Sequence, residues 1–290
     1  MQPLSRRSPQ PLILGAHLSI AGGLHLALHR AVELDCTALQ IFTRNASQWR
    51  AKPLSAEAVT EFRRTREEVG PIAVAAHASY LINLGSPDRR LRDRSIRSLV
   101  QELKRCEALG IEHLVLHPGA HMGAGEERGL RRIASALRRA HARTSGFEVK
   151  TVLENTAGQG TGLGHRFEQL ARIIDDVDAP DRLRICFDTA HAFAAGYDFR
   201  TPRGYAAFWE DVDRLIGLEN LAIFHLNDSR RDVGSRVDRH AHIGRGKIGR
   251  EAFGRLMRDR RFGRVPKVLE TPKEGDMDRR NLALLRRLAR

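Results

Sequence analysis

Eight short apolar runs, spaced along the whole chain, constrain the fold more than any other feature of the sequence. Each run has the length of a buried strand and is too short for a helix. The runs are apolar throughout, as expected for strands that are buried on both faces of a parallel sheet. They are Leu12–His17, Ala38–Thr43, Ile72–His77, His113–Pro118, Lys150–Asn155, Arg184–His191, Ala222–Asp228 and Lys267–Pro272.

Segments with helical spacing of apolar residues separate these runs, for example residues 21–34, 55–69, 92–109 and 126–143. Strands that alternate with helices pair in parallel, and eight such units are the number in a (β/α)8 barrel. The alternative, a doubly wound open sheet, would be expected to carry a glycine-rich phosphate turn after its first strand. "GAHLSIAGG" lacks that pattern, and no P-loop motif occurs. We therefore predict the α/β class, with a single (β/α)8 TIM barrel over residues 12–290 and a disordered leader over residues 1–11.

The charge of the chain indicates the kind of partner it binds. A net charge of +14 and a pI near 10.8 favour a polyanionic partner such as nucleic acid. A second interpretation stays open, because only six of the 49 basic residues are Lys. Arginine runs such as Leu130–Arg143 would also suit solvated helix faces.

Cysteine usage and hydropathy predict a cytoplasmic protein without a membrane-spanning segment. The three cysteines form no C-x-x-C pair, so we expect reduced and unreactive thiols. No apolar run approaches the roughly 18 residues that a membrane helix needs. Residues 1–11 also lack the apolar core of a secretory signal.

Ionisable side chains stand at or just beyond the C-terminal end of six of the eight runs. In a barrel these ends meet at one face, where active sites are built. Burying so many ionisable groups together would cost several kcal/mol each unless cations compensate them. A single such residue is more often a hydrogen-bonded core group, but independent accidents would not fill six strand ends. The six residues are His77, His117, Glu154, Asp188, His225 and Glu270.

The connecting segments add three more candidate ligands, which are His191, Asp238 and His240. In an extended segment Asp238 and His240 project to the same side. The nine groups contain imidazoles and carboxylates but no thiolate, which favours hydrolytic zinc or manganese. A zinc ion takes three or four protein ligands, so nine ligands with one of them bridging would hold about three ions. His17, His121 and His242 lie near the same predicted face and are candidates for supporting roles.

Eight motifs follow one another along the chain. They are "GAHLSIAGG", "HASYLINLGSP", "LHPGAH", "LENTAGQGTGLG", "FDTAHAFAAGYD", "HLNDS", "GSRVDRHAHIGRGKIG" and "LETP". Together they resemble the motifs of endonuclease IV, the zinc-dependent apurinic/apyrimidinic (AP) endonuclease of base-excision repair. The resemblance extends from Leu12 to the C-terminus.

The resemblance implies a barrel with three zinc ions and assigns each predicted ligand to one of them. His77 and His117 would hold the first ion, and Glu154, the implied catalytic residue, would bridge it to the second. Asp188, His225 and Glu270 would complete the second site. The third ion would be held by His191, Asp238 and His240.

The resemblance also implies an activity. The protein would hydrolyse the phosphodiester 5′ to an abasic site in duplex DNA, leaving a 3′-hydroxyl and a 5′-deoxyribose phosphate, with 3′-end trimming as a related activity. Divalent ions bring the pKa of water to about 7 and neutralise charge on the phosphate. Because a duplex must reach the open barrel face, we expect a monomer.

Two loops would contact the DNA if the resemblance holds. Tyr80 and Leu81 match the residues that wedge into the duplex, and Gln48 matches a residue that faces the lesion. Ser47 stands where the family can carry an inserting arginine, which weakens the wedge expected of this loop; Arg44 or Arg50 could partly substitute. Arg239, between two ligands of the third ion, completes the predicted DNA contacts.

Two alternatives remain at this point. A sugar isomerase or epimerase on the same barrel would hold one divalent ion with Glu154, Asp188, His225 and Glu270. It would leave the other five candidate ligands unexplained and would have no use for the positive charge. A non-catalytic protein that binds damaged DNA would use the basic surface but would not need the full ligand set.

Overall fold

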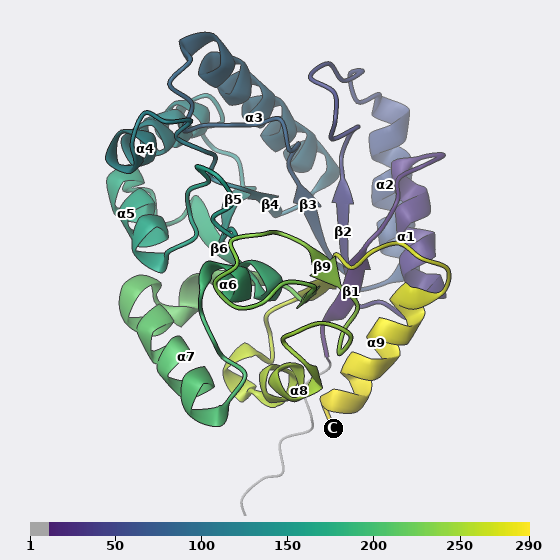
Figure 1. Ribbon diagram of the computed structural model, residues 1–290. Coiled ribbons are helices and arrows are strands. Elements are labelled where there is room, and N and C mark those ends of the chain that lie inside the picture. The colour runs from purple at the N-terminus through teal and green to yellow at the C-terminus, as the bar shows by residue number, and fades with distance from the viewer. Residues whose placement is uncertain (1–11) are drawn as a thin grey trace, which may run out of the picture.

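Eight parallel strands close into a barrel in the computed structural model, which describes residues 12–290 (Figure 1). The strands follow chain order around the barrel, and the pairing of the first with the last closes it. The predicted (β/α)8 barrel is confirmed, and the predicted leader lies outside the described residues. The barrel strands are β1 (Leu14–His17), β2 (Ala38–Phe42), β3 (Ala73–His77), β4 (His113–Leu116), β5 (Lys150–Glu154), β6 (Leu183–Asp188), β7 (Leu221–His225) and β10 (Lys267–Leu269).

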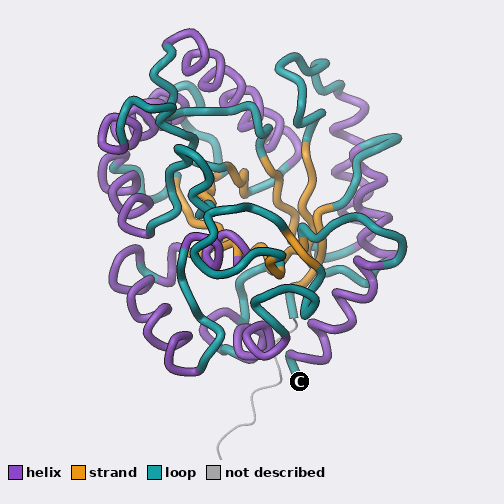
Figure 2. Tube along the Cα trace, in the orientation of Figure 1, coloured by secondary structure: helices purple, strands orange, loops and turns teal. Residues whose placement is uncertain are grey.

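Helices surround the barrel on its outside (Figure 2). Side-chain caps define several helix starts: Ser55 accepts a hydrogen bond from the backbone N–H of Ala58, and Asp88 accepts one from that of Arg90. No helix in residues 12–290 is long and apolar enough to cross a membrane. The helices are α1 (Leu24–Glu33), α2 (Ala56–Val69), α3 (Arg89–Leu109), α4 (Glu126–Ala142), α5 (Phe167–Val177), α6 (Thr189–Ala195), α7 (Pro202–Ile216), α8 (Arg250–Arg258) and α9 (Met277–Leu288).

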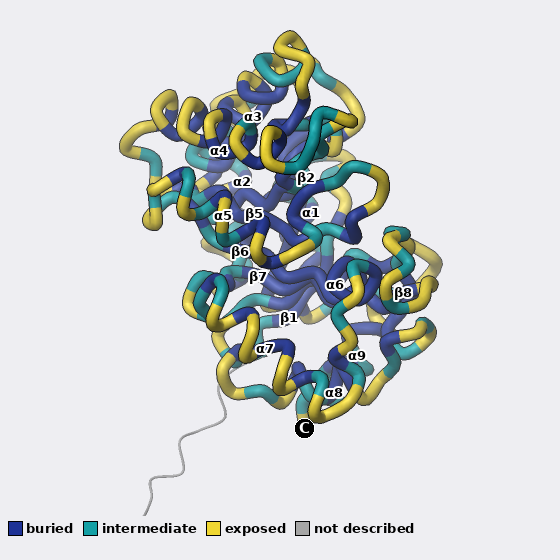
Figure 3. The backbone as a smooth tube through the Cα atoms, turned by 60° about the vertical axis from the view of Figure 1, so that its left-hand side comes forward, coloured by how far each residue is buried: buried dark blue, intermediate teal, exposed yellow. Residues whose placement is uncertain are grey.

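Small and β-branched side chains fill the inside of the barrel, while larger apolar side chains pack between strands and helices. The exposed parts of the chain lie on the outer helices and loops, and the central strands are buried (Figure 3). At Gly15 on β1 there is no room for a side chain, because a Cβ atom would lie 1.6 Å from the backbone oxygen of Ala38 on β2. This core holds the strand ends rigidly. The interior cluster is Ala38, Ala75, Val115, Val152, Cys186, Ile223 and Val268.

The three cysteines are free and buried, as expected for unreactive thiols. Burial raises the pKa of Cys36 to about 11 and that of Cys186 to about 12. It raises the pKa of Cys106 well above its ordinary value. The thiolate, which is the reactive form, is therefore disfavoured at neutral pH.

The predicted run Arg184–His191 was wrong at its C-terminal end, because α6 begins at Thr189. The side chain of Asp188 accepts a hydrogen bond from the backbone N–H of His191 at 2.8 Å and caps this helix. His191 is therefore a helical residue and does not lie in a loop.

A short antiparallel sheet, not predicted from the sequence, lies over the barrel mouth (Figure 1). It pairs β8 (Asp228–Ser229) with β9 (His240–Ala241). The buried carboxylate of Asp228 accepts hydrogen bonds from the backbone N–H groups of Gly244, Gly246 and Ile248 at 2.9, 3.1 and 2.9 Å. This carboxylate fixes the polar, glycine-rich segment that carries Asp238 and His240.

Candidate metal centre

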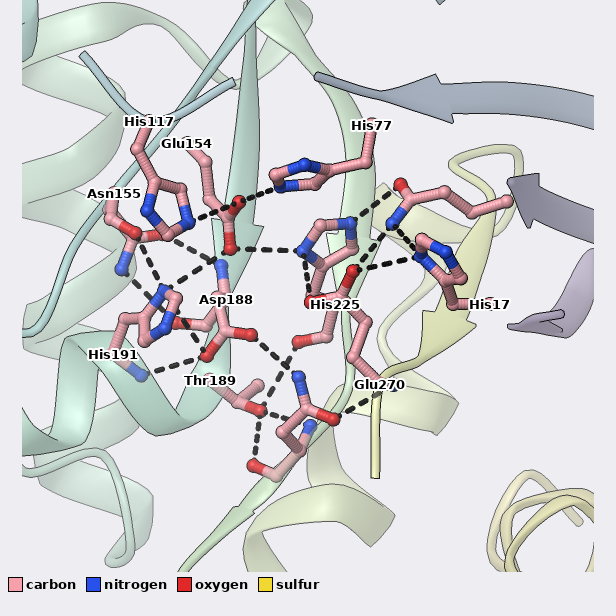
Figure 4. Close-up of polar contacts among 12 residues, drawn as sticks. His17, His77, His117, Glu154, Asn155, Asp188, Thr189, His191, His225 and Glu270 are labelled. Carbon is pink, nitrogen blue, oxygen red and sulfur yellow. Dashed lines mark hydrogen bonds and ion pairs between the residues drawn. The ribbon is translucent and has the colours of Figure 1, made fainter. Parts of the chain in front are cut away.

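The nine predicted ligands meet at the C-terminal end of the barrel, and Figure 4 shows seven of them. Four are the last residues of strands: His77 of β3, Glu154 of β5, Asp188 of β6 and His225 of β7. His117 and Glu270 directly follow β4 and β10. His191 lies on α6, His240 on β9, and Asp238 just before β9. A cavity of about 420 Å³ opens over this group.

Glu154 is fully buried at the centre of the group, with imidazoles around both of its oxygens. Its Oε1 lies 3.0 Å from Nδ1 of His225 and 3.2 Å from Nδ1 of His191. Its Oε2 lies 3.2 Å from Nε2 of His77 and 3.1 Å from Nε2 of His117. A carboxylate whose two oxygens face different sets of donors is well placed to bridge two cations.

A second set of contacts joins α6 to the segment that contains β9. Nε2 of His191 lies 3.2 Å from Oδ2 of Asp238, and Nε2 of His240 lies 3.3 Å from Oδ1 of the same carboxylate. Asp188 reaches this set as well, since its Oδ2 lies 3.8 Å from Nε2 of His240. The extended arrangement of Asp238 and His240 therefore points both side chains at His191.

The donor atoms fit divalent cations in number, type and spacing. In each of three groups that contain only histidines and carboxylates, the potential ligand atoms lie within 4.8 Å of one another. In addition, Nε2 of His240 is buried, and among the described residues it makes no hydrogen bond, although the carboxylate of Asp238 lies 3.3 Å away. A buried nitrogen without a hydrogen bond is costly, and a bound cation would satisfy it. The groups are His77 with His117 and Glu154; Glu154 with Asp188, His225 and Glu270; and Asp188 with His191 and His240.

In four of the five imidazoles, one ring nitrogen makes a hydrogen bond that fixes the orientation of the ring. Such bonds leave the other nitrogen free to face a metal ion and fix the tautomer. The pairs are His77 Nδ1 with the backbone oxygen of Ala78 (2.8 Å), His191 Nδ1 with that of Asn155 (2.9 Å), His240 Nδ1 with that of Glu270 (3.1 Å), and His225 Nε2 with Oε1 of Gln40 (2.8 Å).

Gln40 is a residue of the site that the sequence analysis missed. Its side-chain amide donates to Oε1 of Glu270 at 2.6 Å, and its oxygen accepts from His225. Gln40 is fully buried on β2. Its signal in the sequence was a lone polar residue inside the apolar run "ALQIF".

Two asparagines adjacent to ligands were missed as well. Asn227 donates from Nδ2 to Oδ2 of Asp188 at 2.6 Å, and its Oδ1 accepts from the backbone N–H of Glu270 at 2.9 Å. Asn155 accepts from the backbone N–H of Asp188 at 2.7 Å. Both asparagines stand within two residues of a ligand in the sequence; Asn227 orients the carboxylate of Asp188, and Asn155 holds the backbone of Asp188 in place.

The three histidines expected to support the site differ in their placement. His17 lines the cavity, with Nδ1 3.4 Å from Oε1 of Glu270. His242 is buried behind β9, 3.1 Å from the side-chain nitrogen of Asn281. His121 accepts from the backbone N–H of Gly125 and stabilises the turn before α4.

The electrostatics of the site favour the ionised forms of Glu154, His191 and Asp238 when no cation is bound. Burial alone would raise the pKa of Glu154, but His225 and His117 hold it well below its usual range. Burial alone would lower the pKa of His191, but Asp188 and Asp238 raise it well above its ordinary value. The pKa of Asp238 falls to about 2 because His191 and His240 outweigh its burial. Bound cations would take the place of these imidazole protons.

Four of the five predicted DNA-contacting residues are wholly or partly exposed. Gln48, Tyr80 and Arg239 are exposed, and Leu81 is half-buried. Tyr80 lines the cavity although 67% of its surface is exposed, and its ring centroid lies 5.3 Å from that of Phe42.

Arg44 is not placed for the predicted DNA contact. Its side chain is 3% exposed, and Nη2 lies 3.0 Å from Oε1 of Glu102 on α3. The positive charge of Arg44, which we expected at the surface, is therefore neutralised by Glu102 inside the protein.

The chain is similar to known proteins over nearly its whole described length. Residues 28–288 match a family model described as AP_endonuc_2, xylose isomerase-like TIM barrel. The probable endonuclease 4 of Chloroflexus aggregans is 52% identical over 278 residues, which cover 95% of this chain and 97% of that protein. That of Geobacter sulfurreducens is 53% identical over 280 residues, covering 96% and 94%.

Two solved structures illustrate the range of the fold. Endonuclease IV from Thermus thermophilus superposes with a TM-score of 0.84 at 40% identity, over 96% of this chain and 98% of that one. A D-tagatose 3-epimerase-like protein superposes with a TM-score of 0.75 at 21% identity, over 96% and 97%. The second likeness shows the fold alone.

Proposed function

This chain belongs to the endonuclease IV family, and from that premise we propose that it is a metal-dependent AP endonuclease of base-excision repair. It hydrolyses the phosphodiester 5′ to an abasic site in duplex DNA and leaves a 3′-hydroxyl and a 5′-deoxyribose phosphate. The observation that carries this proposal is the meeting of nine ionisable side chains around the fully buried Glu154. The protein acts as a monomer in the cytoplasm, with 3′-end trimming as a related activity.

We assign the nine side chains to three divalent ions, zinc or manganese. Each assignment is supported by the distances among the donor atoms. When bound, such ions lower the pKa of water and neutralise charge on the phosphate and the leaving oxygen. The first ion is assigned to His77, His117 and Glu154; the second to Glu154, Asp188, His225 and Glu270; and the third to His191, Asp238 and His240.

The residues of the protein hold this site in place before substrate arrives. Gln40 and Asn227 fix the two ends of the second group through hydrogen bonds to Glu270 and Asp188. The barrel core keeps the strand ends in register, so the ligands need little reorganisation on metal binding. Preorganised charge of this kind is the largest single contribution to catalysis in many enzymes.

DNA contacts are proposed for the exposed residues around the cavity. The aromatic ring of Tyr80 offers a face on which a sugar or base can stack. Gln48 and Arg239 are exposed and supply polar contacts. Extruding an unpaired abasic sugar costs little, and this low cost is a source of selectivity. The net charge of +14 supports a large, salt-dependent phosphate contribution to binding.

An incision assay on a duplex with one abasic site tests the proposal. We expect a single cut 5′ to the lesion, loss of activity with a chelator, and recovery with zinc or manganese. Binding without cutting in the presence of metal would support a damaged-DNA binder. One bound ion together with epimerisation of a ketose would support the sugar epimerase, which uses only the second group of ligands. Either result would overturn the endonuclease proposal.

A further inference from the structure

A buried ion pair lies beneath the two loops that we assign to DNA contact. Arg44 follows β2, and Glu102 lies in the middle of α3; their side chains are 3% and 1% exposed. Nε and Nη2 of Arg44 donate to Oε1 of Glu102 at 3.1 and 3.0 Å. Nη2 also donates to the hydroxyl of Ser98 at 2.7 Å. Charge-assisted hydrogen bonds in a buried place are strong and keep their geometry.

The remaining arm of the guanidinium holds the loop that contains Gln48. Nη1 of Arg44 donates to the backbone oxygens of Gln48 and Trp49 at 2.7 and 3.3 Å. The loop therefore folds back over the arginine with which it begins. The exposed side chain of Gln48 is attached to a backbone that is fixed from beneath.

The carboxylate of Glu102 holds the second loop. Its Oε1 accepts a hydrogen bond from the backbone N–H of Ser79 at 3.1 Å. Ser79 directly precedes Tyr80, and its hydroxyl donates to the backbone oxygen of Ala46 in the first loop. One ion pair thus connects residues 44–49, residues 79–80 and α3.

We propose that Arg44 and Glu102 are positioning residues for the recognition of abasic DNA. Their ion pair fixes Gln48 relative to Tyr80, which lines the cavity, before DNA binds. Loops that are ordered in advance do not lose conformational entropy on binding, so affinity is gained without a new contact. This inference rests on the proposed function, because it gives the two loops their role in opening the duplex.

The arrangement requires arginine and not merely a positive charge. Each of the three guanidinium nitrogens has a different set of partners, which a single ammonium group cannot reproduce. Arg44→Lys therefore keeps the charge opposite Glu102 but loses most of the bonds to the loop. This variant separates positioning of the loop from neutralisation of the buried carboxylate.

The test compares Arg44→Lys, Arg44→Met and Glu102→Gln with a matched control, Arg182→Met. Arg182 donates to the backbone and side-chain oxygens of Thr144, both at 3.0 Å, and so ties a loop at the opposite end of the barrel. Each protein is assayed on a duplex in which the abasic site is flanked by intact base pairs. The same lesion in an unpaired bulge serves as a second substrate, because no base pairs need to be opened there.

We expect Arg44→Met to raise KM on the paired duplex by about tenfold to a hundredfold, as a misplaced recognition element does. On the bulge the rise should be under about threefold, and kcat and the zinc content should stay unchanged. Arg44→Lys should show a smaller rise of the same kind. Arg182→Met should change neither KM. Equal losses on both substrates, a loss in the control, or an unchanged KM in Arg44→Met would overturn the inference.

Hydrogen exchange supplies a readout that does not depend on activity or on full folding of the methionine variant. In Arg44→Lys, amides of residues 44–50 and 78–85 should exchange faster together, with the strands unchanged. Unchanged exchange in both loops, or faster exchange throughout the barrel, would overturn a positioning role. If the wild-type protein does not incise abasic duplex at all, the proposed function fails, and the exchange result still decides whether the pair orders the loops.

Discussion

Replacing Glu154 by Gln removes the charge at the centre of the candidate metal centre without changing the shape of the side chain. The carboxylate lies 3.0 to 3.2 Å from four imidazole nitrogens, so its charge acts at short range. It is also fully buried, so water does not screen it.

The size of the effect follows from the electrostatics of such a site. At an effective dielectric constant of about 20, two unit charges about 4 Å apart interact by about 4 kcal/mol. That energy corresponds to about three powers of ten in a rate or an equilibrium constant. Because Glu154 is proposed to serve two ions, we expect bound zinc to fall from three ions to about one. We expect kcat for incision to fall by at least about a thousandfold.

Metal analysis of the purified protein and incision kinetics at saturating zinc measure both quantities. Glu274→Gln is the matched control, because Glu274 is 63% exposed and lies 3.4 Å from His242 at the edge of the site. It should keep three ions and its kcat. If Glu154→Gln retained three ions and lost less than about tenfold in kcat, the bridging role would be refuted.

Three further predictions concern protons and DNA. Burial alone would lower the pKa of His191, but Asp188 and Asp238 raise it, so a bound cation must displace the imidazole proton. Zinc affinity, measured by competition titration, should therefore rise between pH 6 and pH 8, with release of protons on binding. Burial lowers the pKa of Lys267 to about 8. Between that value and about 10.4, the pKa of lysine in an unfolded chain, only the unfolded state holds the proton, so the free energy of unfolding should rise with pH. Urea unfolding of Lys267→Met should not show this rise. Tyr80→Ala should raise KM for abasic duplex by about tenfold, whereas Tyr80→Phe should stay near wild type, because a ring face is what stacks.

The strand ends could be predicted because burial leaves a direct trace in the sequence. An apolar run that stops at His77 or Glu154 marks both the strand and the face to which it points. The structure also gives a physical reason for the errors at the ends of runs. The segment after Asp188 stays apolar, and the helix is marked by the hydrogen bond that the side chain of Asp188 accepts from the backbone N–H of His191 in α6.

Arg44 could not be placed from the sequence because its partner is far away along the chain. Glu102 lies 58 residues later, and the pattern of α3 does not reveal that this glutamate faces inward. An arginine in a polar loop is ordinarily exposed, and here the loop wraps around it instead. Gln40 was missed for a different reason: it lies inside an apolar run, and we assigned it to the strand without giving it a chemical role.

The small sheet over the barrel mouth has a consequence for how the site would lose its ions. Two of the three ligands assigned to the third ion come from the segment that Asp228 fixes, whereas every ligand of the other two stands on or directly after a barrel strand. A fluctuation that lifts this segment would dismantle one site and spare the rest. Demetallation should then be stepwise, with a partly loaded intermediate whose lifetime depends on one carboxylate outside the coordination sphere.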